Sequence, residues 1–372
     1  MQNTGKLLFD LFALHSPRLP LGDQMNILKK SVAAFFFLCF SIPVVAEELN
    51  ILTWKNYLPN KIAKQFSMDT GVKLNVVLFD SNEDLLQMLK DESVPCDVCV
   101  PSDYMVATLI DEVLLKPVDR KLVPNFKHIG SKFLNLYFDP DNKYSVPYLW
   151  GTSGIGFNRQ NAGEVDSWSV LFDAKNKGKI SMLNDARECF AVALKMMGKS
   201  VNDTDQKNLS EAASKLLAQK PFVKKYDSEN FADLLASGEV AIVHGYSGEL
   251  AALATKSPDK FGYVVPREGS TVALDNLCVP TKAKNVAMAH ALIDFLHQPK
   301  IAAMIVNETG YASSNEESKK FVDASVLANK SIYPNEETLS RCEYVKELGD
   351  LGGVLGESST LVDDAWKKIQ GK

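Results

Sequence analysis

LNILTWKNYLPNKIAKQFSMDTGVKLNVVLF, residues 49–79, reads as a strand, a helix and a second strand. Its first six residues have the short apolar pattern of a buried strand. Ile62 and Phe66 then recur at helical spacing, and Gly71 marks the expected end of the helix. The last eight residues again favour a strand. This order predicts a βαβ unit, in which a helix joins two parallel strands.

The same alternation continues along the chain. Ser81 and Asp84 have the spacing of a capping box ahead of a helix over 85–89, and DVCVPS (97–102) then favours a strand. Later signals predict two strands around Trp150 and Gly151, a strand at KISML (179–183) and a helix from Asp185 to Met197. We therefore expect an α/β protein whose parallel sheet is covered on both faces.

Length and composition are those of an ordinary soluble protein. The chain has 372 residues, of which 46% are hydrophobic and 23% charged. This length suggests about two domains, each large enough to bury a core. We expect two α/β lobes in close contact, with a ligand bound between them.

The N-terminal segment has the features of an export signal. Residues 25–46 combine a positively charged start, an apolar run and a small-residue cleavage site. The apolar run stops at Pro43, short of the roughly 20 residues that a membrane span needs. We therefore expect a cleaved signal peptide and a mature chain that begins at Glu47, with residues 1–24 as an upstream extension.

The expected mature chain is acidic. Removing residues 1–46 takes away four of the 41 Lys and Arg residues and two of the 46 Asp and Glu residues. The remaining 37 positive and 44 negative charges give a net charge of −7. This balance argues against nucleic acid or an anionic membrane surface as a partner bound by bulk charge.

Cys96 and Cys99 form a CxxC motif, the spacing found in thiol oxidoreductases. In those enzymes the motif opens a helix, which lowers the pKa of the first thiol. Here the surrounding residues favour a strand, in which positions three apart point to opposite faces. The mature chain has five cysteines, so complete pairing is excluded; the others are Cys189, Cys278 and Cys342.

Motifs of catalysis are missing from the sequence. There is no GxxxxGK[ST] phosphate loop, GTSGIG lacks the order of a dinucleotide fingerprint, and the five histidines form no HxxxH pair. GYSGE (245–249) resembles a nucleophile elbow but lacks its second glycine at the required place. We therefore expect no catalytic residue, no metal ligand and no cofactor.

NDARECF (184–190) places two carboxylates three residues apart at the start of an apolar segment. Asp185 and Glu188 can form a capping box, in which each side chain satisfies a backbone N–H of the first helical turn. Both can instead face a cleft and bind a cation. Taken alone, the motif favours capping.

Aromatic or acidic side chains occur at each of the expected strand ends. In open α/β sheets, ligands bind beyond the carboxyl ends of the strands. Aromatic rings flank methylene groups and attract cations, and carboxylates accept hydrogen bonds from ammonium groups. The residues concerned are Trp54, Tyr57, Ser102, Tyr104, Asp185, Glu188, Tyr246, Glu249, Asp275 and Tyr311.

Eight short segments occur in a fixed order: WKNYLP, SNEDLLQML, VPSDYMV, YSVPYLWGTSGIGFN, NDARECF, LDNLCVPTKAKN, FLHQPKIAAMIVNETGYASSN and YPNEETL. Through them the chain resembles the periplasmic spermidine/putrescine-binding proteins, the solute receptors of polyamine ABC transporters, from Leu49 to Lys368. The resemblance implies a two-lobed periplasmic-binding-protein fold of type II with the ligand cleft between the lobes. Lobe 1 would comprise residues 47–149 plus 274–319, and lobe 2 residues 150–273 plus 320–372.

The resemblance also implies the ligand, its contacts and its destination. Asp185 and Glu188 would hold one amine of a polyamine and Asp275 another, which leaves capping of the helix to Asn184. The protein would be periplasmic and monomeric, and would dock on ABC permease subunits in the inner membrane. The residues that line the channel would be Trp54, Tyr57, Ser102, Tyr104, Tyr246, Glu249 and Tyr311.

Four positions depart from the pattern of the family. Ala273 stands where relatives have an aromatic residue, and Val345 where spermidine-type members have an amide. Lys55 and Asn56 replace a hydroxyl residue and an acidic residue. A lysine that points inward would repel an amine, so we expect Lys55 to face solvent.

Two other functions stay open from the residues alone. One is an exported thiol oxidoreductase that uses Cys96 and Cys99. The other keeps the receptor fold but binds a different solute, such as an anion or a ferric ion held by tyrosines. A thiol count with and without denaturant tests the first, and titration with spermidine, putrescine and Fe³⁺ tests the second.

Overall fold

The computed structural model describes residues 48–346 and 357–371. The predicted signal peptide and the expected mature start at Glu47 lie outside the described residues. Glu48–Lys372 form one compact unit. In the described part of the chain, no helix combines the length and apolarity that a membrane crossing requires.

Eleven strands form one sheet within the described residues. Its order is β2-β1-β3-β9-β4-β7-β5-β6, with β8 and β10 paired to β4 and β11 paired to β9. The strands are β1 (Glu48–Thr53), β2 (Lys73–Leu78), β3 (Val98–Cys99), β4 (Ser145–Asn158), β5 (Ile180–Met182), β6 (Val223–Tyr226), β7 (Ile242–Tyr246), β8 (Phe261–Val264), β9 (Thr271–Cys278), β10 (Ala312–Ser313) and β11 (Glu343–Tyr344).

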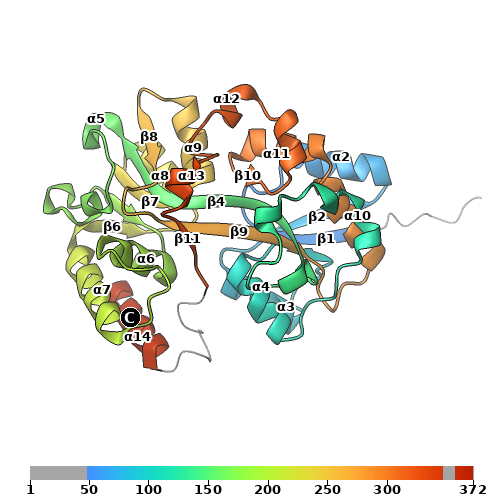
Figure 1. Ribbon diagram of the computed structural model, residues 1–372, viewed down its shortest axis with the longest axis horizontal. Coiled ribbons are helices and arrows are strands. Elements are labelled where there is room, and N and C mark those ends of the chain that lie inside the picture. Colours follow the sequence, from blue (N-terminus) through green and yellow to red (C-terminus); the bar gives the residue numbers. More distant parts are fainter. Residues whose placement is uncertain (1–47, 347–356, 372) are drawn as a thin grey trace, which may run out of the picture. The chain divides into compact units, whose positions relative to one another are not determined.

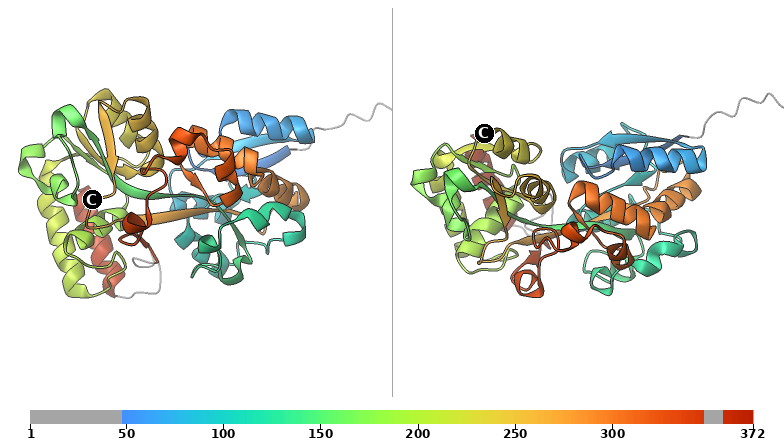
Figure 2. Two further views of the ribbon diagram at one scale, coloured as in Figure 1. Left: turned by 45° about the horizontal axis from the view of Figure 1, so that its top comes forward. Right: turned by 90° about the horizontal axis from the view of Figure 1, so that it is seen from above.

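Helices gather around the two ends of this sheet (Figure 1). The helix α14, from the C-terminal part of the chain, packs on α7 (Figure 2). The helices are α2 (Asn60–Thr70), α3 (Asn82–Asp91), α4 (Asp103–Asp111), α5 (Arg159–Ala162), α6 (Ala186–Met196), α7 (Gln206–Gln219), α8 (Phe231–Ser237), α9 (Ser247–Lys256), α10 (Val286–Leu296), α11 (Pro299–Thr309), α12 (Ala324–Leu327), α13 (Glu336–Leu339) and α14 (Glu357–Gln370).

The segments β1, α2 and β2 form the predicted βαβ unit. β1 pairs in parallel with β2 on one side and with β3 on the other. Ile62 and Phe66 turn the apolar face of α2 toward the core. Gly71 ends the helix with a φ of 72°, which glycine adopts without a Cβ clash, and its N–H donates to the Ser67 carbonyl. The prediction from residues 49–79 is confirmed.

The sheet is mixed, which corrects the expectation of a parallel sheet. The segments β2-β1-β3 and β7-β5-β6 are parallel, and β11 pairs in parallel with β9. In contrast, β9 runs antiparallel to β3 and β4, and β4 runs antiparallel to each of its partners. β4 is a single strand of 14 residues where the sequence predicted two. Gly151 does not turn the chain but pairs with Ala273, and a Cβ there would lie 2.6 Å from Ser247 Oγ.

β4 connects the two ends of the sheet. Its residues 145–152 pair with β9, and its residues 153–157 pair with β7 (Figure 1). The lobe boundaries expected from the sequence stay a prediction. The two largest hydrophobic cores are built from different parts of the chain: one includes Leu52, Phe66 and Leu277, and the other includes Trp168, Phe190 and Ile242.

Candidate functional site: an acidic and aromatic pocket

A cavity of about 660 Å³ lies beyond the carboxyl ends of β1, β2, β3, β5, β6 and β7. This is the position at which α/β sheets bind ligands. All ten residues singled out from the sequence line the cavity, although their role as ligand contacts stays a prediction. They are Trp54, Tyr57, Ser102, Tyr104, Asp185, Glu188, Tyr246, Glu249, Asp275 and Tyr311.

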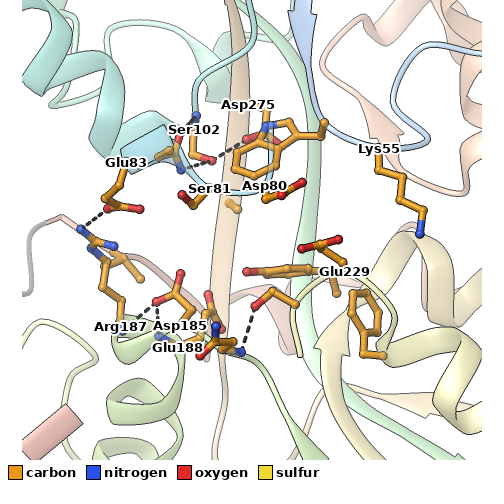
Figure 3. A pocket seen from close by; sticks show the side chains of 18 of the residues that line it. Lys55, Asp80, Ser81, Glu83, Ser102, Asp185, Arg187, Glu188, Glu229 and Asp275 are labelled. Carbon is orange, nitrogen blue, oxygen red and sulfur yellow. Dashed lines mark hydrogen bonds and ion pairs between the residues drawn. The ribbon is translucent and has the colours of Figure 1, made fainter. Parts of the chain in front are cut away.

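Asp275, in β9, is held by two hydroxyl groups. Tyr57 donates to its Oδ2 at 2.6 Å. Ser102 donates to its Oδ1 at 2.7 Å (Figure 3). Burial raises the pKa of Asp275 to about 6, and the two hydrogen bonds oppose that rise. Because its partners are hydroxyls rather than cations, the negative charge of the ionised carboxylate stays available to a cationic ligand.

Asn82 supports this wall of the pocket and was not predicted. It follows Ser81, which caps α3 by accepting from the Asp84 N–H, as the sequence predicted. The buried Asn82 amide donates to Ser102 Oγ at 3.1 Å and to the Tyr104 hydroxyl at 2.9 Å. Its carbonyl oxygen accepts from the Ser102 N–H. One amide thus positions two predicted site residues.

Asp185 is the N-cap of α6. Its Oδ1 accepts from the backbone N–H of Arg187 at 2.8 Å and of Glu188 at 3.3 Å. The expectation that Asn184 caps the helix is therefore wrong, because Asp185 itself has the extended backbone and the side-chain bonds of a cap. Burial raises the pKa of Asp185. The residue caps the helix and lines the pocket at the same time.

Glu188 turns its carboxylate toward strands β4, β7 and β9. Ser153 donates to its Oε2 at 2.6 Å, and Thr271 donates to its Oε1 at 2.9 Å. His244 Nε2 lies 3.4 Å from Oε2. Glu188 is 7% exposed, so these groups hold a nearly buried carboxylate in the wall of the pocket.

Aromatic pairs make up much of the remaining wall. Such rings offer both an apolar face and an attraction for cations. The ring centroids are 4.4 Å apart in the pair Trp54–Phe79, 4.8 Å in Tyr57–Tyr311 and 5.8 Å in Phe231–Tyr246.

Several lining residues were not predicted as site residues. Phe79 follows β2 and Tyr226 ends β6, so the signal of aromatic residues at strand ends could have found them. Trp366 is brought to the pocket by α14 and carries no such signal. Ala273 and Val345, two departures from the family pattern, also line the pocket.

Tyr311 requires glycine at position 248, in the first turn of α9. A Cβ at Gly248 would lie 2.3 Å from two ring carbons of Tyr311. We expect Gly248→Ala to displace the ring, to lower the free energy of unfolding by about 1–3 kcal/mol and to weaken ligand binding. Thermal unfolding and calorimetric titration measure the two effects. Lys256 is exposed on the same helix, so Lys256→Ala should change neither the stability nor the ligand affinity. Wild-type stability and affinity in Gly248→Ala would contradict the prediction.

Arg187 is a cation within the pocket and was also not predicted. Its Nη2 lies 2.9 Å from Glu83 Oε1, and its guanidinium lies 4.3 Å from the centre of the Tyr104 ring. The ion pair joins α6 to α3, which belong to opposite ends of the sheet (Figure 3). Glu83 is therefore already neutralised by the protein.

Two further side-chain pairs connect the same two parts of the protein. Lys55 is exposed, but it also lines the pocket rather than pointing only to solvent, and its Nζ donates to Asn230 Oδ1 at 3.2 Å. Asn56 donates to Glu249 Oε1 at 2.9 Å, and burial raises the pKa of Glu249. Both departures from the family pattern therefore make contacts across the pocket.

Carboxylates dominate the charge of the pocket. Among the described residues, eleven acidic side chains and two basic ones, Lys55 and Arg187, line it. Such an excess favours a cationic ligand and opposes an anionic one. The acidic residues are Asp80, Glu83, Asp84, Asp103, Asp185, Glu188, Asp227, Glu229, Glu249, Asp275 and Asp363.

The CxxC thiols lie outside this pocket. Cys96 and Cys99 interact through their side chains, so the expectation that they point to opposite faces is wrong. The reason is that Cys96 lies before β3 begins, where the alternation of side chains along a strand does not apply. Burial raises the pKa of both thiols, whereas reactive thiols have a lowered pKa. All five cysteines within the described residues are free thiols. This environment disfavours a redox role.

Comparison with known proteins agrees with the fold and the site. The family model of the bacterial extracellular solute-binding proteins matches residues 61–332. The spermidine/putrescine-binding periplasmic protein of Salmonella typhimurium is 32% identical over 314 residues, which cover 84% of this chain and 90% of the relative. The putrescine-binding periplasmic protein PotF of Escherichia coli is 30% identical over 318 residues, or 80% and 86%.

Solved structures agree as well. The spermidine/putrescine ABC transporter substrate-binding protein PotD of Streptococcus pneumoniae is 30% identical, with a TM-score of 0.75 over 88% of this chain and 99% of that one. This likeness confirms the two-lobed type II fold. With a family match over most of its length and the fold of a solute receptor, the chain belongs to the bacterial extracellular solute-binding proteins.

Proposed function

We propose that this protein binds a polyamine, spermidine or putrescine, and delivers it to an ABC importer. The observation that carries the proposal is the lining of the pocket, which within the described ranges includes eleven carboxylates, two bases and several aromatic rings. The relatives named for spermidine and putrescine binding match this chain over at least 80% of its length, which supports the same class of ligand.

The chemistry of a linear polyamine matches this lining. An ammonium group that leaves water loses several kcal/mol of hydration unless acceptors of the protein replace the water. Figure 3 places Asp275 and Ser102 on one side of the pocket and Asp185 and Glu188 on the other. Separated anions can hold the ends of one chain of methylenes while aromatic rings pack along it. The separation of the anions then selects the length of the ligand.

The ligand reaches the site through an opening motion of the two lobes. Hinge closure around a ligand is typical of this class of receptor, and β4 and β9 are the strands that connect the lobes. The pairs Arg187–Glu83, Lys55–Asn230 and Asn56–Glu249 link the lobes and favour the closed form. The closed form is the one that docks on the permease.

The protein acts outside the cytoplasm and without catalysis. Residues 25–46 direct export as a cleaved signal peptide, and the receptor works as a monomer. In this proposal the carboxylates contribute electrostatic contacts rather than acid–base chemistry.

A ligand panel tests the proposal on the mature chain. We expect putrescine or spermidine to raise the melting temperature by roughly 2–4 °C at about 100 times the dissociation constant. Glutamate, as an anion, and N-acetylputrescine, with one cationic end removed, should give smaller shifts. Binding of Fe³⁺ or glutamate in place of the amines would contradict the proposal, and calorimetric titration would supply the affinities.

A further inference from the structure

Lys55 is a cation on the wall of the pocket that the proposed ligand contacts do not include. It lies in the loop after β1, beside Trp54, and lines the same cavity. Its Nζ donates to Asn230 Oδ1 at 3.2 Å, on the facing wall. Figure 3 shows the side chain reaching from its loop toward the wall that carries Glu229. The pocket proposed to bind ammonium groups therefore already contains one that belongs to the protein.

The two bases that line the pocket in the described part of the chain differ in how their charge is used. Arg187 Nη2 lies 2.9 Å from Glu83 Oε1, so these two charges largely cancel. The partner of Lys55 is a neutral amide, and that contact leaves the positive charge in place. Lys55 is therefore the base of this pair whose charge acts on a ligand in the cavity.

The environment of Glu249 shows that the charge of Lys55 acts on the pocket. Asn56 donates to Glu249 Oε1 at 2.9 Å. Burial raises the pKa of Glu249, and Asp233 raises it further, whereas the Asn56 hydrogen bond and the charge of Lys55 oppose the rise. An amide and an ammonium group of the protein thus already serve this carboxylate. Glu249 should attract a ligand ammonium less than Asp275 does, because the partners of Asp275 are hydroxyls.

We propose that Lys55 is a specificity-determining residue, which takes the place of one ligand ammonium beside Glu249 and favours diamines over longer polyamines. This inference rests on the proposed function and deepens it, because it names the preferred class of polyamine. A fixed positive charge repels every ammonium group of a ligand, so the unfavourable energy grows with the number of these groups. The repulsion is smallest for a diamine such as putrescine, larger for a triamine and largest for a tetraamine.

The test is calorimetric titration of the wild type and Lys55→Met with putrescine, spermidine and spermine at pH 7.5. Methionine keeps an unbranched side chain but removes the charge. We expect the dissociation constant of the variant to fall less than about twofold for putrescine, about threefold for spermidine and about tenfold for spermine. Because Lys55 is exposed, these gains should shrink between about 0.1 M and about 1 M salt, where the Debye length falls from about 10 Å to about 3 Å.

Two control variants separate the charge of Lys55 from other effects of its replacement. Lys55→Arg keeps the charge, so it should keep the wild-type ratios of the three affinities. Lys64 is exposed on α2 and lies outside the pocket lining. Lys64→Met therefore removes the same charge from the protein surface and should leave the three dissociation constants unchanged.

The outcomes of this experiment are distinct. A gain in Lys55→Met that grows with the charge of the amine, and that Lys55→Arg lacks, supports the proposal. An absent gain, or an equal gain for the three amines, overturns it. If the wild type binds none of the three amines, the proposed function fails as well.

Discussion

Asp275→Asn is expected to raise the dissociation constants for both spermidine and putrescine about tenfold to a hundredfold. The carboxylate is 4% exposed and is positioned by Tyr57 and Ser102, so a ligand ammonium meets a fixed charge. Asparagine keeps the shape but removes that charge. Calorimetric titration of the variant and the wild type with each amine measures the change.

The same variant should not lose stability in the absence of ligand. The pKa of Asp275 in the folded protein, about 6, lies above its unfolded reference of 3.8. Its contribution to stability is therefore present below pH 3.8 and is lost as the pH rises through about 6. At pH 7.5 the buried charge opposes folding by up to about 3 kcal/mol. The amide removes this cost, so the melting temperature at pH 7.5 should stay equal or rise.

These two readouts separate a binding role from a structural one. Wild-type affinity in Asp275→Asn would refute the assigned role. A large drop in melting temperature would instead show that the carboxylate serves mainly to hold Tyr57 and Ser102. Tyr57→Phe is the matched variant, because it removes one donor to Asp275 and leaves the charge in place. It should weaken binding less than Asp275→Asn does.

Polyamine affinity is expected to fall steeply as the pH is lowered from 7.5 to 5. The amines stay cationic throughout this range, because their pKa values resemble that of lysine. Asp275, with a pKa of about 6, becomes protonated and loses its charge. Protonation of this one group predicts an affinity about tenfold lower at pH 5. The raised pKa values of Asp185 and Glu249 act in the same direction.

A pH series of calorimetric titrations, with the melting temperature of the free protein recorded at each pH, measures this effect. The profile of Asp275→Asn should be flatter near pH 6 than that of the wild type, because its main titrating group is absent. An affinity that does not change between pH 7.5 and pH 5, in a protein that remains folded, would contradict the assignment of ionised carboxylates as the amine ligands.

Much of the local structure could be predicted from neighbouring residues. The end of α2 at Gly71 and the cap of α3 at Ser81 depend on backbone groups only a few positions away. Family resemblance added the ten site residues, which the structure brings to one cavity. The cap of α6 was wrongly assigned to Asn184, because the resemblance assigned Asp185 to the ligand. In the structure, the Asp185 side chain both caps the helix and lines the pocket.

Pairings between distant segments were the part that could not be predicted. β4 is one long strand with antiparallel partners, and Gly151 in its middle pairs with Ala273 of β9, a contact with no local signal. The interaction of Cys96 with Cys99 depends on where β3 begins. Asn82 looks like an ordinary first-turn residue until its contacts with Ser102 and Tyr104 are seen.

The sequence by itself determined the α/β class and the caps of individual helices, because these depend on periodicity and on groups close along the chain. It indicated the family through the resemblance of short segments in a fixed order. Only the tertiary structure decided the electrostatics of the pocket. Tyr57 and Asp275 are 218 positions apart and Glu83 and Arg187 are 104 apart, yet each pair is in direct contact. Burial and charge pairing are properties of atoms that meet in space, and the order of residues does not reveal them.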